Sequence, residues 1–202
     1  MLYFYSKRPE TAPAISKLAA GFLGAGQVLV LPTDTIYGFS CRADDVAAIK
    51  HIFRIKQRDP KKALIVLVDS LEMLKKYTFV SRRQEEFLKK IWLVKNRPTT
   101  IILKSRGNLP RELNGGEDSL ALRLPKSKFL IKIIKTLKKP IVSTSLNLSG
   151  HKNISDLGEL MINFSNPRQY PDLVIDTGQC RRRRPSRLID LRNIDQPLIL
   201  RK

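Results

Sequence analysis

Three short stretches of the chain place hydroxyl, amide or cationic side chains directly beside apolar runs. They are PTDTIYG at 32–38, IKQRDPKK at 55–62 and STSLNLSG at 143–150. Hydroxyls and amides can bind a phosphate or a carboxylate without adding charge, whereas lysine and arginine supply the cations that suit a polyphosphate. Together the three stretches predict a site for an anionic ligand such as a nucleotide.

In the first and third stretches the polar residues alternate along the chain. Thr33 and Thr35 are two positions apart, and so are Ser143, Ser145 and Asn147. Residues at i and i+2 point to the same side wherever the backbone is extended, so each set can line one face of a ligand site. The alternative is a turn with local side-chain to backbone bonds for the first stretch, and a serine-rich turn for the third.

The second stretch carries alternating cations, Lys56 and Arg58, followed by Lys61 and Lys62. In an extended segment Lys56 and Arg58 would share a face and point at the same ligand. Arginine offers a planar fork and lysine a mobile point charge, and both suit a polyphosphate. A solvated cluster of charges is the alternative.

Arg123 stands inside the apolar run LALRL at 120–124. A guanidinium without a partner would be costly in the interior, so this residue needs a carboxylate. The carboxylate belongs either to a ligand or to an internal Asp or Glu. His51 and His151 are isolated, on an expected helix and in an expected loop, so we expect neither of them to bind a metal.

Alternating strands and helices are predicted to position these residues. Continuous apolar runs predict strands at 28–31, 64–68, 99–103, 120–124, 141–145, 173–175, 187–191 and 198–200. Apolar residues at helical spacing predict helices that begin near Thr11 and near Asp44 or Asp45, and others over 71–77, 84–93 and 129–137. This order predicts an α/β domain with an open, twisted, mixed β-sheet flanked by helices. Ligands of such sheets bind beyond the carboxyl ends of the strands.

The bulk composition favours a single domain over residues 1–202 with a large excess of positive charge. The chain is 42% hydrophobic, and 38 Lys plus Arg against 18 Asp plus Glu give a net charge of +20. That charge draws in polyanions, or it solvates a lysine-rich surface. No apolar run approaches ~18 residues, so we expect no membrane span. Cys41 and Cys180 are far apart and no secretory signal is visible, so we expect a reducing cytoplasm.

Four motifs in order resemble the threonylcarbamoyl-AMP synthase family, also called the YrdC or Sua5 family. They are PTDTIYGFSC, IKQR before LIVLV, DSLALRLP and STSLNLSG, and the resemblance runs from about Val28 to Leu191. The KxR element of the family is Lys56-Gln57-Arg58, and its SxN element is Ser145-Leu146-Asn147, with leucine where the family usually has alanine. The resemblance implies a YrdC-like (DHBP synthase-like) fold with a concave basic face.

The resemblance also implies a reaction. Family members condense ATP, L-threonine and bicarbonate or carbon dioxide into threonylcarbamoyl-AMP and pyrophosphate, with Mg²⁺ accompanying ATP. The proteins of the t6A transferase complex then move the threonylcarbamoyl group to adenosine 37 of tRNAs that read codons beginning with A. Contact with tRNA or double-stranded RNA would use the basic face. Two alternatives are a YciO-like paralogue with a related activity and an RNA-binding module without this activity.

The motifs of the family assign roles to individual residues. Lys56 and Arg58 would be catalytic and would contact the phosphates of ATP. Threonine would be bound by Thr33, Thr35, Arg123 and Ser143, and the nucleotide also by Lys62, Ser119, Ser145, Asn147 and Ser186. Asp34 is the nearest candidate for a base. The run Arg181–Arg184 in the tail loop would either bind RNA or cover the nucleotide.

Overall fold

The structure is a computed structural model that describes residues 1–9, 12–93, 97–164, 166–178 and 185–202. Its strands are β1 (Leu2–Tyr5), β2 (Leu29–Leu31), β3 (Gly38–Ser40), β4 (Ile65–Leu67), β5 (Thr99–Lys104), β6 (Ser119–Arg123), β7 (Ile141–Ser145), β8 (Leu173–Asp176), β9 (Arg187–Asp190) and β10 (Leu198–Arg201). Its helices are α1 (Pro13–Gly24), α2 (Val46–Lys56), α3 (Leu71–Tyr77), α4 (Arg82–Leu93), α5 (Lys128–Leu137) and α6 (Leu160–Asn163).

The strands form one mixed sheet in the order β1-β8-β2-β3-β7-β4-β6-β5-β9-β10. Parallel pairs such as β4 with β6 stand beside antiparallel pairs such as β4 with β7. The predicted α/β class and each of the eight predicted strands are therefore confirmed. Two strands were missed: β1 has all four residues exposed and so lacks an alternating pattern, and β3 has only three residues.

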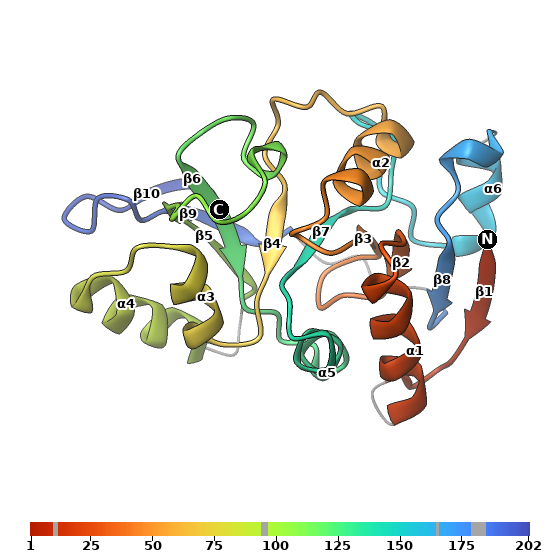
Figure 1. The fold of residues 1–202 in the computed structure, drawn as a ribbon, viewed down its shortest axis with the longest axis horizontal. Coiled ribbons are helices and arrows are strands. Elements are labelled where there is room, and N and C mark those ends of the chain that lie inside the picture. Colours follow the sequence, from red (N-terminus) through yellow and green to blue (C-terminus); the bar gives the residue numbers. More distant parts are fainter. Residues whose placement is uncertain (10–11, 94–96, 165, 179–184) are drawn as a thin grey trace.

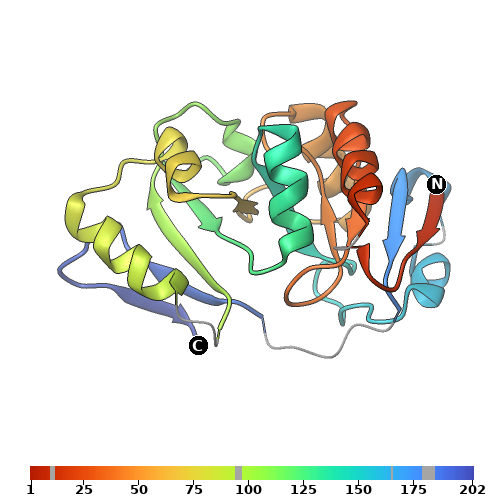
Figure 2. The same ribbon diagram turned by 90° about the horizontal axis from the view of Figure 1, so that it is seen from below.

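Helices lie along both sides of this sheet. Figure 1 shows α2 on one side of the central strands and α1, α5, α3 and α4 on the other. Figure 2, seen from below, shows these four helices in a row. The last two strands, β9 and β10, lie beside α4 at one end of this row. Side chains cap several helices, because Asp45, Ser70 and Ser127 each accept a hydrogen bond from a backbone N–H of the first turn. The predicted cap Thr11 lies outside the described residues, and Ala12 is the N-cap of α1.

The extended conformation that we expected for Lys56 to Arg58 is wrong. Helix α2 continues to Lys56 because it buries one face, including Ile52 and Ile55, against the core. Gln57 then ends the helix in the left-handed conformation, at φ 48°. Lys56 therefore belongs to the helix and Arg58 to the loop after it, so the two side chains do not share a strand face.

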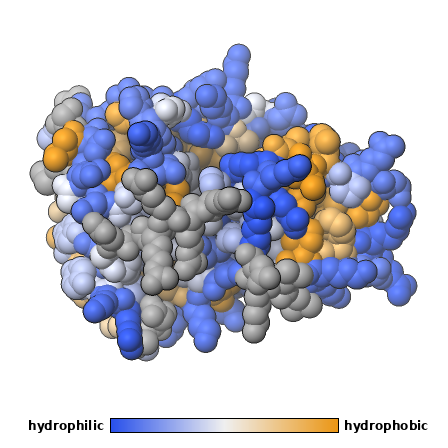
Figure 3. Space-filling view, turned by 180° about the vertical axis from the view of Figure 1, so that it is seen from behind, coloured by the Kyte–Doolittle hydropathy of each residue, from blue (hydrophilic) through white to orange (hydrophobic). Residues whose placement is uncertain are grey.

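The surface is largely hydrophilic, with apolar side chains at the two edges of the sheet. Residues 198–200 of β10 are about half exposed, as are the residues of β1 at the opposite edge. Figure 3, seen from behind, shows a largely hydrophilic face with an apolar area toward the end that carries β10. Among the residues that the structure describes, no helix has the length and apolar character that a membrane span requires.

Candidate active site

A row of side chains across four neighbouring strands forms the floor of a pocket of about 390 Å³. Ile102 on β5 pairs with Ala121 on β6, Ala121 with Ile65 on β4, and Ile65 with Ser143 on β7. Because paired residues point to the same side of a sheet, this row continues without a break across β5, β6, β4 and β7. The pocket thus lies on the face of the sheet, whereas we expected a site beyond the carboxyl ends of the strands. Residues at or just after the ends of β2, β6 and β7 still contribute to its lining.

The row reaches the next strand at Gly38, which pairs with Ser145. A Cβ atom at Gly38 would lie 2.7 Å from the backbone oxygen of Thr144, closer than side-chain carbons approach a backbone atom. Glycine at this position therefore allows β3 to pack tightly against β7. Ser143 and Ser145 both line the pocket, as does Thr144 between them, whereas Asn147, the third member of the predicted alternating set, does not.

A tight turn after β2 forms one wall of the pocket. The hydroxyl of Thr33 accepts hydrogen bonds from the backbone N–H groups of Thr35 (3.0 Å) and Ile36 (3.2 Å) and donates to the carbonyl of Ile36 at 2.6 Å. It also lies 2.9 Å from the hydroxyl of Thr35. Either hydroxyl can be the donor of that pair. Thr35, which lines the pocket, can still form a hydrogen bond to a ligand through its hydroxyl.

Arg123 is buried at the end of β6 and lines the pocket. Its guanidinium lies 3.3 Å from a carboxylate oxygen of Asp34, so the internal partner that the sequence left open exists. The backbone N–H of Lys126 donates to the other oxygen of Asp34, and Asp34 is not part of the pocket lining. Nε of Arg123 makes no hydrogen bond to any described residue. Burial lowers the pKa of Arg123, and the charge of Asp34 opposes that shift.

Arg58 lines the pocket from the loop after α2. Its guanidinium donates to the backbone carbonyls of Lys62 (3.4 Å) and Ala63 (2.9 Å), which hold it against the start of β4. Burial lowers its pKa, but an arginine stays charged in proteins. Arg58 is therefore a fixed cation that can face a ligand phosphate.

Lys56 is placed differently, because it is 1% exposed and is absent from the pocket lining. Its ammonium donates to the backbone oxygens of Ser145 and Asn147 and to the side-chain oxygen of Asn147. Burial, and after it the charge of Arg58, lowers the pKa of Lys56 to about 7. A direct contact between Lys56 and a phosphate stays a prediction.

The other residues implied by the resemblance fall into two groups. Ser186 lines the pocket, is buried, and shares a hydrogen bond of 2.8 Å with Thr100. Lys62 and Ser119 lie outside the lining. Lys62 is exposed, and Ser119 is half-buried on the same face of β6 as Ala121, two residues before it. Asn147 is also outside it, because its side chain is bound to Lys56 and to the backbone of His151.

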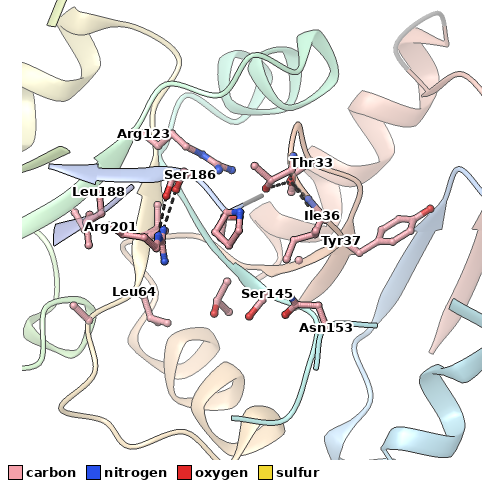
Figure 4. Close-up of a pocket in the computed structure, with 18 of the residues that line it drawn as sticks. Thr33, Ile36, Tyr37, Leu64, Arg123, Ser145, Asn153, Ser186, Leu188 and Arg201 are labelled. Atoms are coloured by element: carbon pink, nitrogen blue, oxygen red, sulfur yellow. Dashed lines mark hydrogen bonds between the residues drawn. The ribbon is translucent and has the colours of Figure 1, made fainter. Parts of the chain in front are cut away.

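Arg201 is a pocket residue that sequence reasoning missed. Strand β10 runs back along β9, which brings Arg201 beside Ser186, and its guanidinium donates to the backbone oxygen and hydroxyl of Ser186 at 2.8 and 3.2 Å. Figure 4 shows Arg123, Ser186 and Arg201 on one side of the pocket, Thr33 and Ile36 on another, and Ser145 and Asn153 below. The only signal was a cation at the end of an apolar run, and the pairing that positions it is not visible in the sequence.

The charges of the pocket lining are all of one sign. Among the residues that the structure describes, the lining has three arginines, Arg58, Arg123 and Arg201, and no carboxylate. Hydroxyls of Thr33, Thr35, Ser143, Ser145 and Ser186 surround the same space. Such a pocket suits a ligand with more than one anionic group. The run Arg181–Arg184 and Cys180 lie outside the described residues.

The described residues contain no group of three or more His, Cys, Asp or Glu side chains placed to hold a metal ion. Any cation in this pocket would therefore have to come with an anionic ligand that supplies most of its oxygen ligands. The phosphates of a nucleotide are ligands of that kind for Mg²⁺.

Comparison with known proteins identifies relatives of this chain. The family model for Sua5, YciO and YrdC, described as "Telomere recombination", matches residues 21–202. The chain is 31% identical to the threonylcarbamoyl-AMP synthase of Pyrococcus abyssi over 176 residues, which are 87% of this chain and 50% of that protein. It is also 31% identical to the threonylcarbamoyl-AMP synthase of Klebsiella pneumoniae over 172 residues, which are 85% of this chain and 88% of that protein.

Solved structures agree with the sequence matches. The structure of P. abyssi Sua5 complexed with L-threonine has a TM-score of 0.83 and 28% identity, and the match covers 99% of this chain and 56% of that one. Escherichia coli YciO has a TM-score of 0.79 and 27% identity, with 100% and 94% covered. This chain spans about half of the length of the P. abyssi protein. The matched range and the identities over most of the chain show that it belongs to the Sua5/YciO/YrdC family.

Proposed function

We propose that this protein is a threonylcarbamoyl-AMP synthase, which makes threonylcarbamoyl-AMP and pyrophosphate from L-threonine, bicarbonate or carbon dioxide, and ATP. The observation that carries the proposal is the pocket on the sheet face, lined by three arginines and seven hydroxyl-bearing residues and by no described carboxylate. Its support comes from relatives of that name at 31% identity and from a P. abyssi relative solved with L-threonine.

Arg123 is the proposed ligand of the threonine carboxylate. Its Nε has no partner among the described residues, although the side chain is 3% exposed, and a buried N–H without an acceptor is costly. A substrate carboxylate would supply that acceptor in a charge-assisted bond. The hydroxyl of Thr35 would form a hydrogen bond to the amine or hydroxyl of threonine, and Thr33 and Ser143 would complete this part of the pocket.

Arg58 and Arg201 are the proposed ligands of the phosphates. Both line the pocket, and both are held by backbone oxygens that fix where their guanidinium groups point. Ser145 and Ser186 line the same space and would add hydroxyl contacts to the nucleotide. Lys62, Ser119 and Asn147 lie outside the lining, so a direct role for them would require a nucleotide that extends beyond this pocket.

The proposed chemistry has two steps. The neutral amine of threonine attacks the carbon of carbon dioxide and gives up a proton to bicarbonate or solvent, which leaves a carbamate. An oxygen of the carbamate then attacks the α-phosphorus of ATP, and the bond from that phosphorus to the bridging oxygen breaks, so that pyrophosphate leaves with the electron pair. Negative charge accumulates on the phosphate oxygens, where fixed cations lower the barrier. Asp34 is bound to Arg123 and Lys126, so it is poorly placed as the base.

Mg²⁺ is proposed to enter with ATP, bound through phosphate oxygens. The pocket lining offers hydroxyls but no carboxylate, so the metal would keep its waters and its phosphate ligands. This suits Mg²⁺, which loses water reluctantly. When bound, the ion would neutralise charge on the departing pyrophosphate. The residues that would face the phosphates bound to the metal are Arg58 and Arg201.

One assay tests the proposal. The protein is incubated with ATP, labelled bicarbonate and single amino acids, and the label is sought in an adduct of AMP together with pyrophosphate. Threonine-dependent labelling is the expected result. Labelling with a different amino acid would assign the chain to another activity of the family, such as that of a YciO-like paralogue, and RNA binding with no labelling would leave an RNA-binding module.

The place of the reaction in the cell follows from the proposal. Threonylcarbamoyl-AMP would be passed to proteins that transfer its threonylcarbamoyl group to tRNA, and the net charge of +20 would favour contact with that RNA. We keep the cytoplasm as the proposed compartment, and one domain over residues 1–202 as the proposed organisation.

A further inference from the structure

The side chain of Lys56 is surrounded by oxygens of one short segment. Lys56 is the last residue of α2, and its ammonium donates to the backbone oxygen of Ser145, to the backbone oxygen of Asn147 at 2.8 Å and to the side-chain oxygen of Asn147 at 2.8 Å. An ammonium has three N–H donors and no acceptor. All three donors are therefore used within the protein, and none is left for a phosphate.

The segment from Ser145 to His151 is held to Lys56 at further points. The backbone N–H of Ser149 donates to the backbone oxygen of Lys56 at 2.8 Å. The hydroxyl of Ser145 donates to the side-chain oxygen of Asn147 at 2.7 Å, and the side-chain amide of Asn147 donates to the backbone of His151 at 2.6 Å. Lys56 thus lies at the centre of a network that folds this segment around the end of α2.

The convergence of three oxygens needs N–H donors between them. Lys56 is 1% exposed, so the two backbone carbonyls and the amide oxygen turn their negative ends toward one another away from water. Without the amino group of Lys56 these oxygens would lose this donor, and buried polar groups with too few partners are costly. The ion pairs of the described residues do not include Lys56, and its ammonium lies 5.6 Å from the centre of the Phe39 ring.

We infer that Lys56 is a positioning residue, whose ammonium holds the end of β7 in the conformation that presents Ser145 to the pocket. Ser145 lines the pocket, whereas Lys56 and Asn147 do not. The KxR and SxN elements then form one structural unit, in which Lys56 and Asn147 shape the wall and Arg58 and Ser145 face the ligand. The consequence for nucleotide binding rests on the proposed function, but the consequence for the structure of residues 145–149 does not.

The first experiment uses the protein without any ligand. Amide hydrogen exchange is compared between the wild type, Lys56→Met and the matched control Lys50→Met, which changes an exposed lysine of the same helix. The amides of Leu146 and Ser149 donate to Tyr37 and Lys56 in the structure. Lys56→Met should speed their exchange by about tenfold or more, and Lys50→Met and the amides of β5 should not change. Equal exchange in the wild type and Lys56→Met would overturn the inference.

The second experiment separates positioning from phosphate contact. If Lys56 acts only through Ser145, Lys56→Met should weaken the binding of AMP and of ATP by the same factor, whereas Arg58→Met should weaken ATP more than AMP. A loss in Lys56→Met that is larger for ATP than for AMP would show direct contact and overturn the inference. If the wild type binds neither nucleotide, the proposed function fails while the exchange experiment still decides the role of Lys56.

A measurement on the wild type covers the case in which Lys56→Met does not fold. The ¹H–¹³C resonance of the Lys56 ε-methylene is followed by NMR in two samples. AMP is added to one sample and ATP to the other. Saturating AMP and ATP should leave this resonance at the same position, because no phosphate reaches the ammonium. A displacement that only ATP produces would contradict the positioning role.

Discussion

The guanidinium of Arg123 lies 3.3 Å from the carboxylate of Asp34, and both side chains are buried beside the pocket. The backbone N–H of Lys126 holds the second oxygen of Asp34. Asp34 therefore orients Arg123 from behind the pocket wall, while Nε of Arg123 makes no hydrogen bond to a described residue. A buried pair arranged in this way keeps the guanidinium oriented, as the proposed contact with a carboxylate ligand requires.

The first prediction concerns the substitution Arg123→Lys. The lysine keeps the positive charge beside Asp34, which limits the loss of stability, but it lacks the planar fork. The dissociation constant for L-threonine should rise by about 10- to 100-fold, the effect of losing a hydrogen bond to a charged group worth about 1.5–3 kcal/mol. Calorimetric titration measures it, and thermal unfolding checks the fold. Unchanged threonine affinity in a folded variant would remove Arg123 from the threonine site.

The second prediction concerns the two arginines assigned to the phosphates. Arg58→Met and Arg201→Met should each lower kcat/KM for ATP on the order of 10²-fold, because each removes a fixed cation from the place where charge develops. The control Lys50→Met removes one positive charge from an exposed position on α2 and should leave the rate within about twofold of the wild type. Steady-state pyrophosphate release measures all three. If the control loses as much activity as Arg58→Met, net charge rather than position explains the loss.

The third prediction concerns Leu146, the middle residue of the SxN element. Its side chain is fully buried in the core, so it does not face the ligand. Leu146→Ala should lower the free energy of unfolding by about 2–5 kcal/mol, since it removes buried methyl groups and leaves a cavity. Urea unfolding followed by circular dichroism gives the value. A loss below about 1 kcal/mol would mean that the site collapses around the smaller residue.

The fourth prediction follows from the pKa of Lys56, which burial lowers from 10.5 to about 7. Between these two values the folded protein has released a proton that the unfolded chain still holds. The unfolded state then binds more protons, so the free energy of unfolding should rise with pH across this window, by at most about 1.4 kcal/mol per pH unit. Lys56→Met should lack this slope. The difference between the wild type and the variant, from urea unfolding at pH 6 to 10, isolates the contribution of Lys56, and parallel curves would contradict the lowered pKa.

The sequence was sufficient to predict the position of each strand that buries a continuous apolar run. Strands β2, β4, β6 and β7 were predicted within one or two residues, since each alternates with a helix of clear periodicity. Strand β1 could not be predicted in this way, because its four residues are exposed on both faces and only its pairing with β8 orders it.

For the candidate site, the residue types were easier to predict than their surroundings. Thr33, Thr35, Arg58, Arg123, Ser143, Ser145 and Ser186 were named from the motifs, and they all line one pocket. The burial of Lys56 could not be predicted, because it depends on helix α2 continuing one turn further and on oxygens from a segment about 90 residues away. Arg201 was missed for a similar reason, since it reaches the pocket only through the pairing of β10 with β9.

The most direct test of the account is pyrophosphate release from ATP, measured while L-threonine, bicarbonate and ATP are each omitted in turn. We expect release only when all three are present, with one threonylcarbamoyl-AMP formed for each pyrophosphate. Release at the same rate without threonine, or none when all three are supplied to folded protein, would contradict it.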